Sequence, residues 1–206
     1  MAYRETPRMR ARKEATRQRI LDTTHALVAE GGFGLASVAR VAEKAGVAIG
    51  SVYRHFESKS DLFAEVFRRA TEQEVNKVAE ALDSTAAADD ALAQSLGVFA
   101  RRAIRGPTMA WALIAEPVDP LVDEERLRYR QAYAELFQKN LIRGIEEGCF
   151  RPDQDPQLCS AAIVGAIAEA LVGPLSPAAG GLDSESADRL IEDIVRFCMQ
   201  AVSTGE

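Results

Sequence analysis

Apolar residues recur along the chain at intervals of three and four positions, which places them on one side of a helix. The first such helix begins within the basic run at residues 8–13 and ends at Gly31 and Gly32, because glycine readily adopts the left-handed conformation that closes a helix. Its inward side is formed by five residues: Ile20, Leu21, Thr24, Leu27 and Val28. We find no segment with the strict alternation of polar and apolar residues that is typical of a strand.

Eight further helices are predicted from similar stripes and from the residues that cap and separate them. Ser37 begins a short helix that Gly46 ends, and a second short helix covers residues 48–55. Residues 58–61, with the sequence SKSD, form a capping box at the start of a long fourth helix. The other five helices are expected at residues 89–105, 107–116, 120–147, 158–173 and 184–203. The pattern therefore predicts an all-α fold of nine helices.

The charge of the chain is unevenly distributed. Residues 1–60 contain eleven Lys or Arg and six Asp or Glu, so they carry +5, whereas the chain as a whole carries −6 and its remainder therefore −11. A basic end on an acidic body is typical of a protein that turns one end towards a polyanion. The alternative is that the basic residues nearest the N-terminus form a solvated arm: Arg4, Arg8, Arg10 and Arg12.

Residues 37–56 have the layout of a helix-turn-helix, with a short capped helix, a glycine turn and a second short helix. Apolar residues can hold the two helices against the first helix: Val38, Val41, Ala42, Val47 and Val52. The outer face of the second helix is then formed by Ile49, Gly50, Ser51, Tyr53 and Arg54. A helix of this kind fits the major groove of B-DNA and presents its side chains to the base edges.

The run GLASVARVAEKAGV at residues 34–47, followed by GSVYRHF at 50–56 and SK at 58–59, resembles the tetracycline-repressor (TetR/AcrR) family of bacterial transcriptional regulators. The resemblance covers about residues 14–70. It implies a helix-turn-helix DNA-binding domain at residues 1–60 and a helical effector-binding and dimerisation domain at 61–206. Ala48 departs from the family pattern, because many relatives have Ser or another small polar residue there, and this removes a possible helix cap.

The resemblance also implies which residues contact DNA. Eight are expected to do so: Ser37, Ile49, Gly50, Ser51, Tyr53, Arg54, His55 and Lys59. Tyr53, His55 and Lys59 are expected at phosphates, which position the protein without reading the sequence. Ile49 and Arg54 are expected to select the sequence, since an isoleucine can contact a thymine methyl group and an arginine can pair with guanine. Taken alone, the histidine and the tyrosine fit an ordinary surface equally well.

A small-molecule pocket between the fourth and eighth helices is the next feature that the resemblance implies. Candidate lining residues are Phe99, Arg102, Met109, Trp111, Glu116, Tyr129, Tyr133 and Phe137, with Arg105 as a further polar anchor. Ligand pockets are mostly apolar and contain a few placed polar groups. Aromatic residues at helical spacing also form ordinary cores, so both interpretations remain open for each residue. We expect the only tryptophan, Trp111, to be the most informative of them.

The eighth helix is apolar on almost every side, and residues 158–182 contain one charged residue, Glu169. A terminal helix of this kind must be covered. We expect a homodimer through the eighth and ninth helices, with the interface residues Ile163, Ile167, Leu171, Ile191, Ile194 and Cys198. Burial of these residues within one subunit is the alternative. A dimer would read the two half-sites of a palindromic operator in double-stranded DNA.

The remaining features exclude several functions. The three cysteines form no CxxC pair, so we expect no disulfide framework, metal site or cofactor. We expect no signal peptide, because no apolar segment follows the basic N-terminus. The longest charge-free stretch near the C-terminus, residues 156–168, is expected to be too short for a membrane span, which predicts a cytoplasmic protein. Common catalytic motifs are absent, and an enzyme is not expected. The sequence therefore predicts a dimeric repressor that a small, largely apolar ligand releases from DNA. The alternative is an effector-independent regulator whose C-terminal domain only dimerises.

Overall fold

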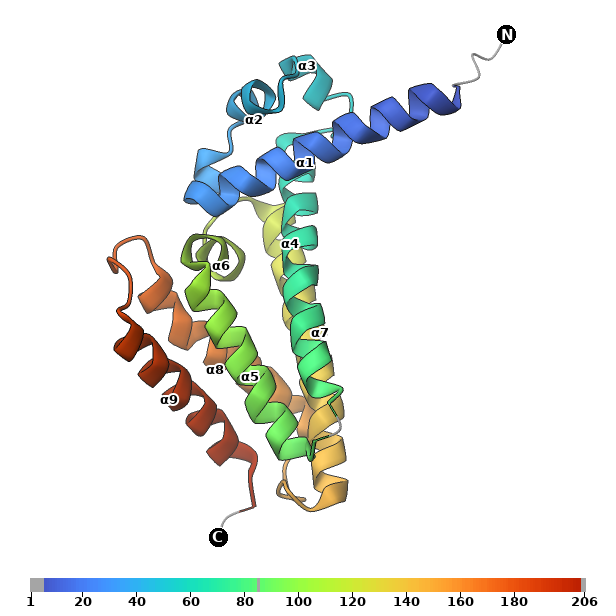
Figure 1. Cartoon of the computed structure of the whole chain (residues 1–206). Coiled ribbons are helices and arrows are strands. Elements are labelled where there is room, and N and C mark those ends of the chain that lie inside the picture. The colour runs from blue at the N-terminus through green and yellow to red at the C-terminus, as the bar shows by residue number, and fades with distance from the viewer. Residues whose placement is uncertain (1–5, 85, 205–206) are drawn as a thin grey trace.

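The computed structural model describes residues 6–84 and 86–204, and within them the chain forms nine α-helices (Figure 1). The prediction of an all-α fold of nine helices is confirmed. In chain order the helices are α1 (Pro7–Leu35), α2 (Val38–Ala45), α3 (Ile49–Val52), α4 (Lys59–Leu82), α5 (Ala88–Arg105), α6 (Pro107–Ile114), α7 (Pro120–Glu147), α8 (Pro156–Leu175) and α9 (Ser184–Val202). Arg4, which the sequence places in the basic arm, lies outside the described residues.

The N-terminal unit is built from α1, α2, α3 and the start of α4. All five residues of the stripe predicted on α1 are buried. The ring of Phe33, near the end of α1, packs against Phe63 of α4 with 5.0 Å between the ring centroids. Ala112 of α6 and Tyr129 of α7 belong to the same apolar core. The N-terminal unit is therefore joined to the rest of the molecule through a shared core, because residues 1–60 do not close it alone.

The helices α4 to α9 form a bundle beneath the N-terminal unit (Figure 1). α8 is two residues longer at each end than predicted, and Ile163, Ile167 and Leu171 on it are buried in the second apolar core. Among the described residues, this is the one helix that is long and apolar enough to cross a membrane by length and composition. The prediction that this stretch is too short for a membrane span is therefore wrong by length, and one side of α8 packs within the bundle.

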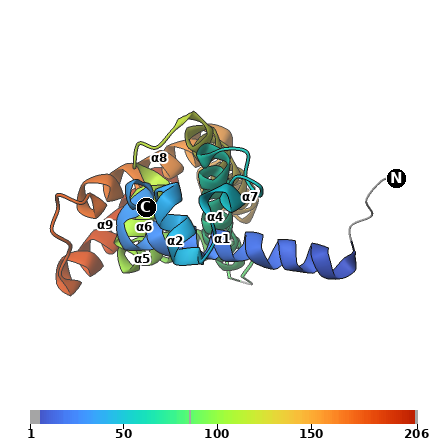
Figure 2. The same cartoon turned by 90° about the horizontal axis from the view of Figure 1, so that it is seen from above.

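α1 is helical from Pro7, and the side chain of Thr6 caps it. The basic run at residues 8–13 is therefore helical rather than an irregular arm, and Figure 2 shows this end of α1 projecting beyond the rest of the molecule. Near its other end, α1 is interrupted at Gly31 and Gly32, where the backbone angles are not helical. The helix end predicted at this glycine pair is thus a kink, after which one more turn follows.

Candidate DNA-binding surface and ligand cavity

α2 and α3 form the helix-turn-helix. They meet at Gly46, whose φ of +65° lies in the left-handed region that glycine tolerates. Ser37 caps α2, because its Oγ accepts a hydrogen bond from the N–H of Arg40 at 3.3 Å. α3 is a single turn, Ile49–Val52, and Ala48 before it provides no side-chain cap. The helical turn is therefore shorter than predicted, and the chain continues from it in hydrogen-bonded turns.

The eight residues expected to contact DNA all lie in the N-terminal unit, on α2, α3, the turn after α3 and the start of α4. Six are exposed and two, Ser51 and His55, are half-buried. The side chains of Ile49 and Tyr53 are 50% and 49% exposed, which is high for large apolar residues next to a buried Val52. The structure thus presents an outward face of the kind that the sequence predicts, and the DNA contacts themselves remain a prediction.

An open basic cleft separates the projecting end of α1 from the end of the recognition element. Arg10, Lys13 and Arg17 of α1 line one side of it, and Arg54 and His55 line the other. The Nδ1 atom of His55 is buried and has no hydrogen-bond partner. Burial lowers the pKa of His55, and the positive charges of Lys13 and Arg17 lower it further. Glu14 also lines the cleft, but the cations there outnumber this carboxylate, so a phosphate placed in the cleft would meet net positive charge.

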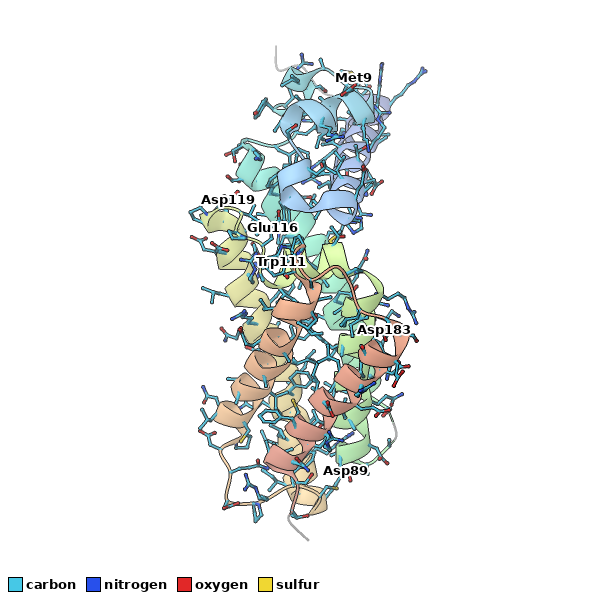
Figure 3. The ribbon with its side chains drawn as sticks, turned by 90° about the vertical axis from the view of Figure 1, so that its left-hand side faces the viewer. Met9, Asp89, Trp111, Glu116, Asp119 and Asp183 are labelled. Atoms are coloured by element: carbon cyan, nitrogen blue, oxygen red, sulfur yellow. The ribbon has the colours of Figure 1, made fainter. Side chains whose placement is uncertain are left out.

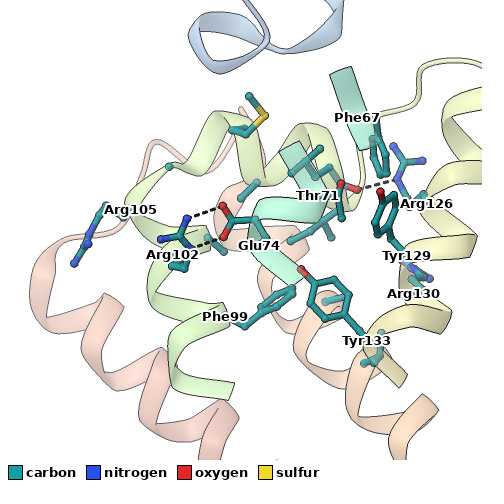
Figure 4. Close-up of a pocket in the computed structure, with 18 residues that line it drawn as sticks. Phe67, Thr71, Glu74, Phe99, Arg102, Arg105, Arg126, Tyr129, Arg130 and Tyr133 are labelled. Carbon is teal, nitrogen blue, oxygen red and sulfur yellow. Dashed lines mark hydrogen bonds and ion pairs between the residues drawn. The ribbon is translucent and has the colours of Figure 1, made fainter. Parts of the chain in front are cut away.

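A second hollow, a cavity of about 330 Å³, lies in the bundle between α4, α5, α6, α7 and α8 (Figure 4). Six residues named from the sequence line it: Phe99, Arg102, Arg105, Met109, Tyr129 and Tyr133. Burial raises the pKa of Tyr133 far above its ordinary value, so its phenol stays neutral. The ring of Phe99 meets that of Tyr133 edge-on, with 5.3 Å between the centroids. The wall is therefore largely aromatic and aliphatic.

Three residues predicted to line the pocket do not do so, and the prediction is wrong for them. Trp111 lies on the side of α6 that packs against the C-terminal core. Phe137 is 1% exposed and lies one helical turn beyond the cavity wall on α7. Glu116 follows the end of α6, and its carboxylate accepts hydrogen bonds from the backbone N–H groups of Phe33 at 2.9 Å and Gly34 at 3.1 Å.

Further lining residues on α4 and α7 are not predicted from the sequence. Phe67, Thr71 and Glu74 of α4 line the cavity, and so do Arg126 and Arg130 of α7. The three α4 positions follow the spacing i, i+4, i+7, which marks one face of a helix. This spacing could have identified them, because the pocket is expected between the fourth and eighth helices.

The charged and polar groups of the cavity fall into paired and unpaired sets. Arg102 and Glu74 form a two-armed ion pair, in which Nη2 of Arg102 donates to Oε1 of Glu74 at 2.8 Å (Figure 4). This carboxylate raises the pKa of Arg102. Thr71 is only 6% exposed, and its hydroxyl has no hydrogen-bond partner. Arg105 and Arg130 are exposed at the edge of the cavity, and among the described residues they form no hydrogen bond or ion pair. The edge of the cavity therefore carries unpaired positive charge, and its wall contains one unsatisfied hydroxyl.

The six residues predicted to form a dimer interface lie inside the protomer, so the prediction is wrong for them. Ile163, Ile167, Leu171, Ile191, Ile194 and Cys198 are all at most 7% exposed and belong to the C-terminal core. Burial raises the pKa of the Cys198 thiol to about 11. The outward sides of α8 and α9 carry other apolar residues, notably Leu158 and Phe197, which are 67% and 64% exposed.

The chain is similar to known regulators in sequence. The family model described as bacterial regulatory proteins, tetR family, matches residues 20–66. Over 154 residues the chain is 32% identical to the HTH-type transcriptional repressor KstR2 of Rhodococcus jostii (strain RHA1). The matched region covers 71% of this chain and 73% of that protein. Over 157 residues it is 25% identical to the fatty acid metabolism regulator protein of Bacillus subtilis (strain 168), covering 73% and 78%.

Solved structures show the same fold. FadR of Bacillus subtilis, solved with stearoyl-CoA, has a TM-score of 0.74 at 20% identity and covers 88% of this chain and 97% of that one. A transcriptional regulator from Saccharomonospora viridis, solved with choline, has a TM-score of 0.75 at 20% identity and covers 93% and 100%. The relatives are transcriptional regulators and not enzymes. With its helix-turn-helix and its relation to KstR2, the chain belongs to the tetR family of bacterial regulatory proteins and is a DNA-binding transcriptional regulator.

Proposed function

We propose that this protein is a cytoplasmic, homodimeric repressor that leaves a palindromic operator when a largely apolar ligand fills the cavity. The observation that carries the proposal is the place of the cavity. Met109 and Leu113 of α6 line it and also pack against the core of the N-terminal unit. A ligand that moves this wall must therefore disturb the support of the helix-turn-helix. A domain that only dimerised would need no such cavity, which disfavours the effector-independent alternative.

The charge in the cavity supports a ligand with an apolar body and an anionic end. The unpaired guanidinium groups of Arg105 and Arg130 can bind a carboxylate or phosphate, and the Thr71 hydroxyl can hydrogen-bond to a polar atom. Stearoyl-CoA, present in the FadR structure, combines an acyl chain with phosphates. Choline, present in the Saccharomonospora viridis structure, is a cation. The positive excess here favours the first chemistry over the second.

The proposed operator contacts follow from the exposed face of the N-terminal unit. Arg54 and Ile49 are assigned to base edges, and Tyr53, His55 and Lys59 to phosphates. One short recognition turn buries too little surface for a specific site, so two protomers must bind together, at half-sites about one helical turn apart or at a related spacing. The exposed apolar residues Leu158 and Phe197 support a self-interface on the outward sides of α8 and α9.

Selection of bound duplexes from a random pool tests the proposal. The expected result is a palindrome, whose spacing gives the distance between the two recognition elements. With Arg54→Ala, discrimination should be lost at one or two base pairs in each half-site, at a cost of about 1–3 kcal/mol if the contact is bidentate to guanine. Arg40→Ala, on the exposed side of α2, is the control. Recovery of no common sequence would contradict the proposal, and a uniform loss with Arg54→Ala would make Arg54 a backbone contact.

A further inference from the structure

At the junction between the ligand cavity and the DNA-binding unit, the carboxylate of Glu116 contacts the backbone of α1. We propose that Glu116 is a positioning residue that fixes the helix-turn-helix to the cavity wall in the orientation that binds the operator. The inference rests on the proposed function and adds the residue through which the two sites communicate. Figure 3 shows Glu116 where the N-terminal helices meet the bundle, in the segment that follows α6.

On the DNA-binding side, Glu116 binds backbone rather than side chains. Its Oε2 accepts from the N–H of Phe33 at 2.9 Å, and its Oε1 accepts from the N–H of Gly34 at 3.1 Å. These donors are free because the kink in α1 interrupts the helical hydrogen bonds just before them. A carboxylate that accepts two N–H groups at once fixes both the position and the direction of that segment.

The kink is also what makes room for the carboxylate. Gly32 has a φ of +74°, a conformation that other residues rarely adopt. A Cβ atom at this position would lie 2.7 and 2.8 Å from the two carboxylate oxygens of Glu116. Glycine at position 32 therefore serves both the backbone turn and the close approach of Glu116. The two positions are 84 residues apart in the sequence but constrain each other in the fold.

On the cavity side, Arg126 fixes the backbone of the same residue. Its Nη2 donates to the carbonyl of Glu116 at 2.8 Å, and its Nε donates to the carbonyl of Leu113 at 3.0 Å. Arg126 thus binds the free carbonyls at the end of α6. It also lines the cavity, and its guanidinium lies 5.7 Å from the ring centroid of Phe67, another lining residue. A ligand that displaces α6 or Arg126 therefore displaces Glu116 and the segment that it holds.

Glu116→Ala removes the contact, and Glu124→Ala provides a matched control, because Glu124 is exposed on neighbouring α7 and forms no hydrogen bond or ion pair with a described residue. The first measurement is amide hydrogen exchange of the free proteins. Exchange at the amides of Phe33 and Gly34 should be about tenfold faster in Glu116→Ala. A hydrogen bond to a charged group stabilises the closed state of an amide enough to slow its exchange by this factor or more. Exchange there should be unchanged in the control. Equal rates in both variants would overturn the proposal.

The second measurement is affinity for the operator selected from random duplexes. Glu116→Ala should bind it about fivefold or more weakly than the control, because fewer molecules hold the binding orientation. In the unaltered protein, the operator should also slow exchange at the amides of Ala115 and Glu116, which follow α6. In Glu116→Ala, the operator should no longer slow exchange at Ala115 and Glu116 but should still slow exchange in α3. A merely structural role of Glu116 would not predict this difference. Unchanged affinity with faster exchange at Phe33 would overturn the positioning role.

Glu116→Gln guards against a folding defect, because its amide keeps the size of the side chain and one acceptor. It should fold normally and show intermediate exchange and intermediate affinity. A Glu116→Gln protein with unaltered values for both would overturn the proposal. If the unaltered protein selected no operator, the proposed function would fail, but the exchange rates at Phe33 and Gly34, which need no DNA, would still decide whether the contact holds the segment.

Discussion

Lys59 lies at the first position of α4, where two effects favour a bound phosphate. Its ammonium group is exposed and lies 4.8 Å from the ring centroid of Phe63. A cation held over an aromatic face loses little further freedom on binding an anion. The first N–H groups of a helix and the positive end of its dipole also attract phosphate. Both effects act on any DNA sequence, so the contribution of Lys59 should be to affinity and not to specificity.

Lys59→Ala should therefore weaken binding to all duplexes and reduce the slope of log affinity against log salt by about one, because one fewer counterion is released. The measurement is a salt series with operator and non-operator duplexes. Lys77→Ala is the control, since Lys77 lies on the same helix and pairs with Glu80. An unaltered slope for Lys59→Ala would remove Lys59 from the DNA contacts.

The two histidines make stability depend on pH. Burial is the first cause that lowers the pKa of both His25 and His55, followed by the charges of Arg69 for His25 and of Lys13 for His55. The unfolded chain, with histidine pKa values of about 6.5, then takes up protons before the folded chain does. Stability is therefore complete above about pH 6.5 and falls as the pH drops through the lowered values.

Thermal unfolding at pH 7.5 and 5.5 measures this effect, and the melting temperature should be lower at pH 5.5. The double variant His25→Gln and His55→Gln should show a smaller difference. Carboxylates with a lowered pKa, such as that of Asp183, lose their contribution at more acidic pH, so they do not obscure this window. A melting temperature with the same pH dependence in both proteins would contradict the assignment.

At the scale of the helix, the helix ends could be predicted from the sequence because they depend on local residues. Ser37, Gly46 and Ser58 mark helix ends through their own backbone and side-chain preferences, and the structure places each at a helix end. The assignment of helix faces was harder. On α8 a stripe of Ile and Leu was assigned to the dimer, but such residues gain most from the protomer's own core, which is where they lie. The outward side carries smaller residues and Leu158, a weaker pattern in the sequence.

Phe197→Glu tests the outward side of α9 as the dimer interface. Phe197 is 64% exposed in the protomer, so a glutamate there should leave the fold intact but place a charge in the interface. Sedimentation should show a monomer, and operator affinity should fall with it. Leu127→Glu is the matched control, because Leu127 is 68% exposed on α7. An intact Phe197→Glu dimer at low micromolar concentration would place the interface elsewhere.

Contacts between distant parts of the chain could not be predicted from the sequence. Glu116 is predicted to be a polar anchor of the pocket because it follows the helix that contains Trp111, and nothing in the sequence relates it to Gly32 or Phe33. The family resemblance implies a pocket between the fourth and eighth helices, and the structure has a cavity there that Phe99, Tyr129 and Tyr133 line. The prediction for Trp111 is wrong, because successive residues of a helix are about 100° apart around its axis and the sequence does not fix which side of α6 faces the cavity.

For the whole molecule, we expect a ligand in the cavity and the operator to favour different conformations of the protein. A compound that fills the cavity should lower operator affinity, and the operator should lower the affinity for that compound by the same factor, typically about 5–150-fold. Titration calorimetry with and without operator measures both factors, with stearoyl-CoA as the first probe. Thr71→Val should lower the affinity of the protein for the compound. It should leave the operator affinity of the ligand-free protein unchanged. Unequal factors, or a Thr71→Val protein with unaltered ligand affinity, would contradict the assignment of the cavity.

The contact between Glu116 and the N–H groups of Phe33 and Gly34 has a consequence for how such proteins diverge. Backbone donors are present whatever side chains the recognition element carries, so the junction does not depend on the DNA sequence that is read. New operator preferences can then arise by changes at positions such as Ile49 and Arg54 without loss of the response to ligand. A chimera that joins residues 61–206 to the DNA-binding unit of a relative should remain inducible, provided that position 32 is glycine and that the apolar residues packing against Phe63, Ala112 and Tyr129 are kept.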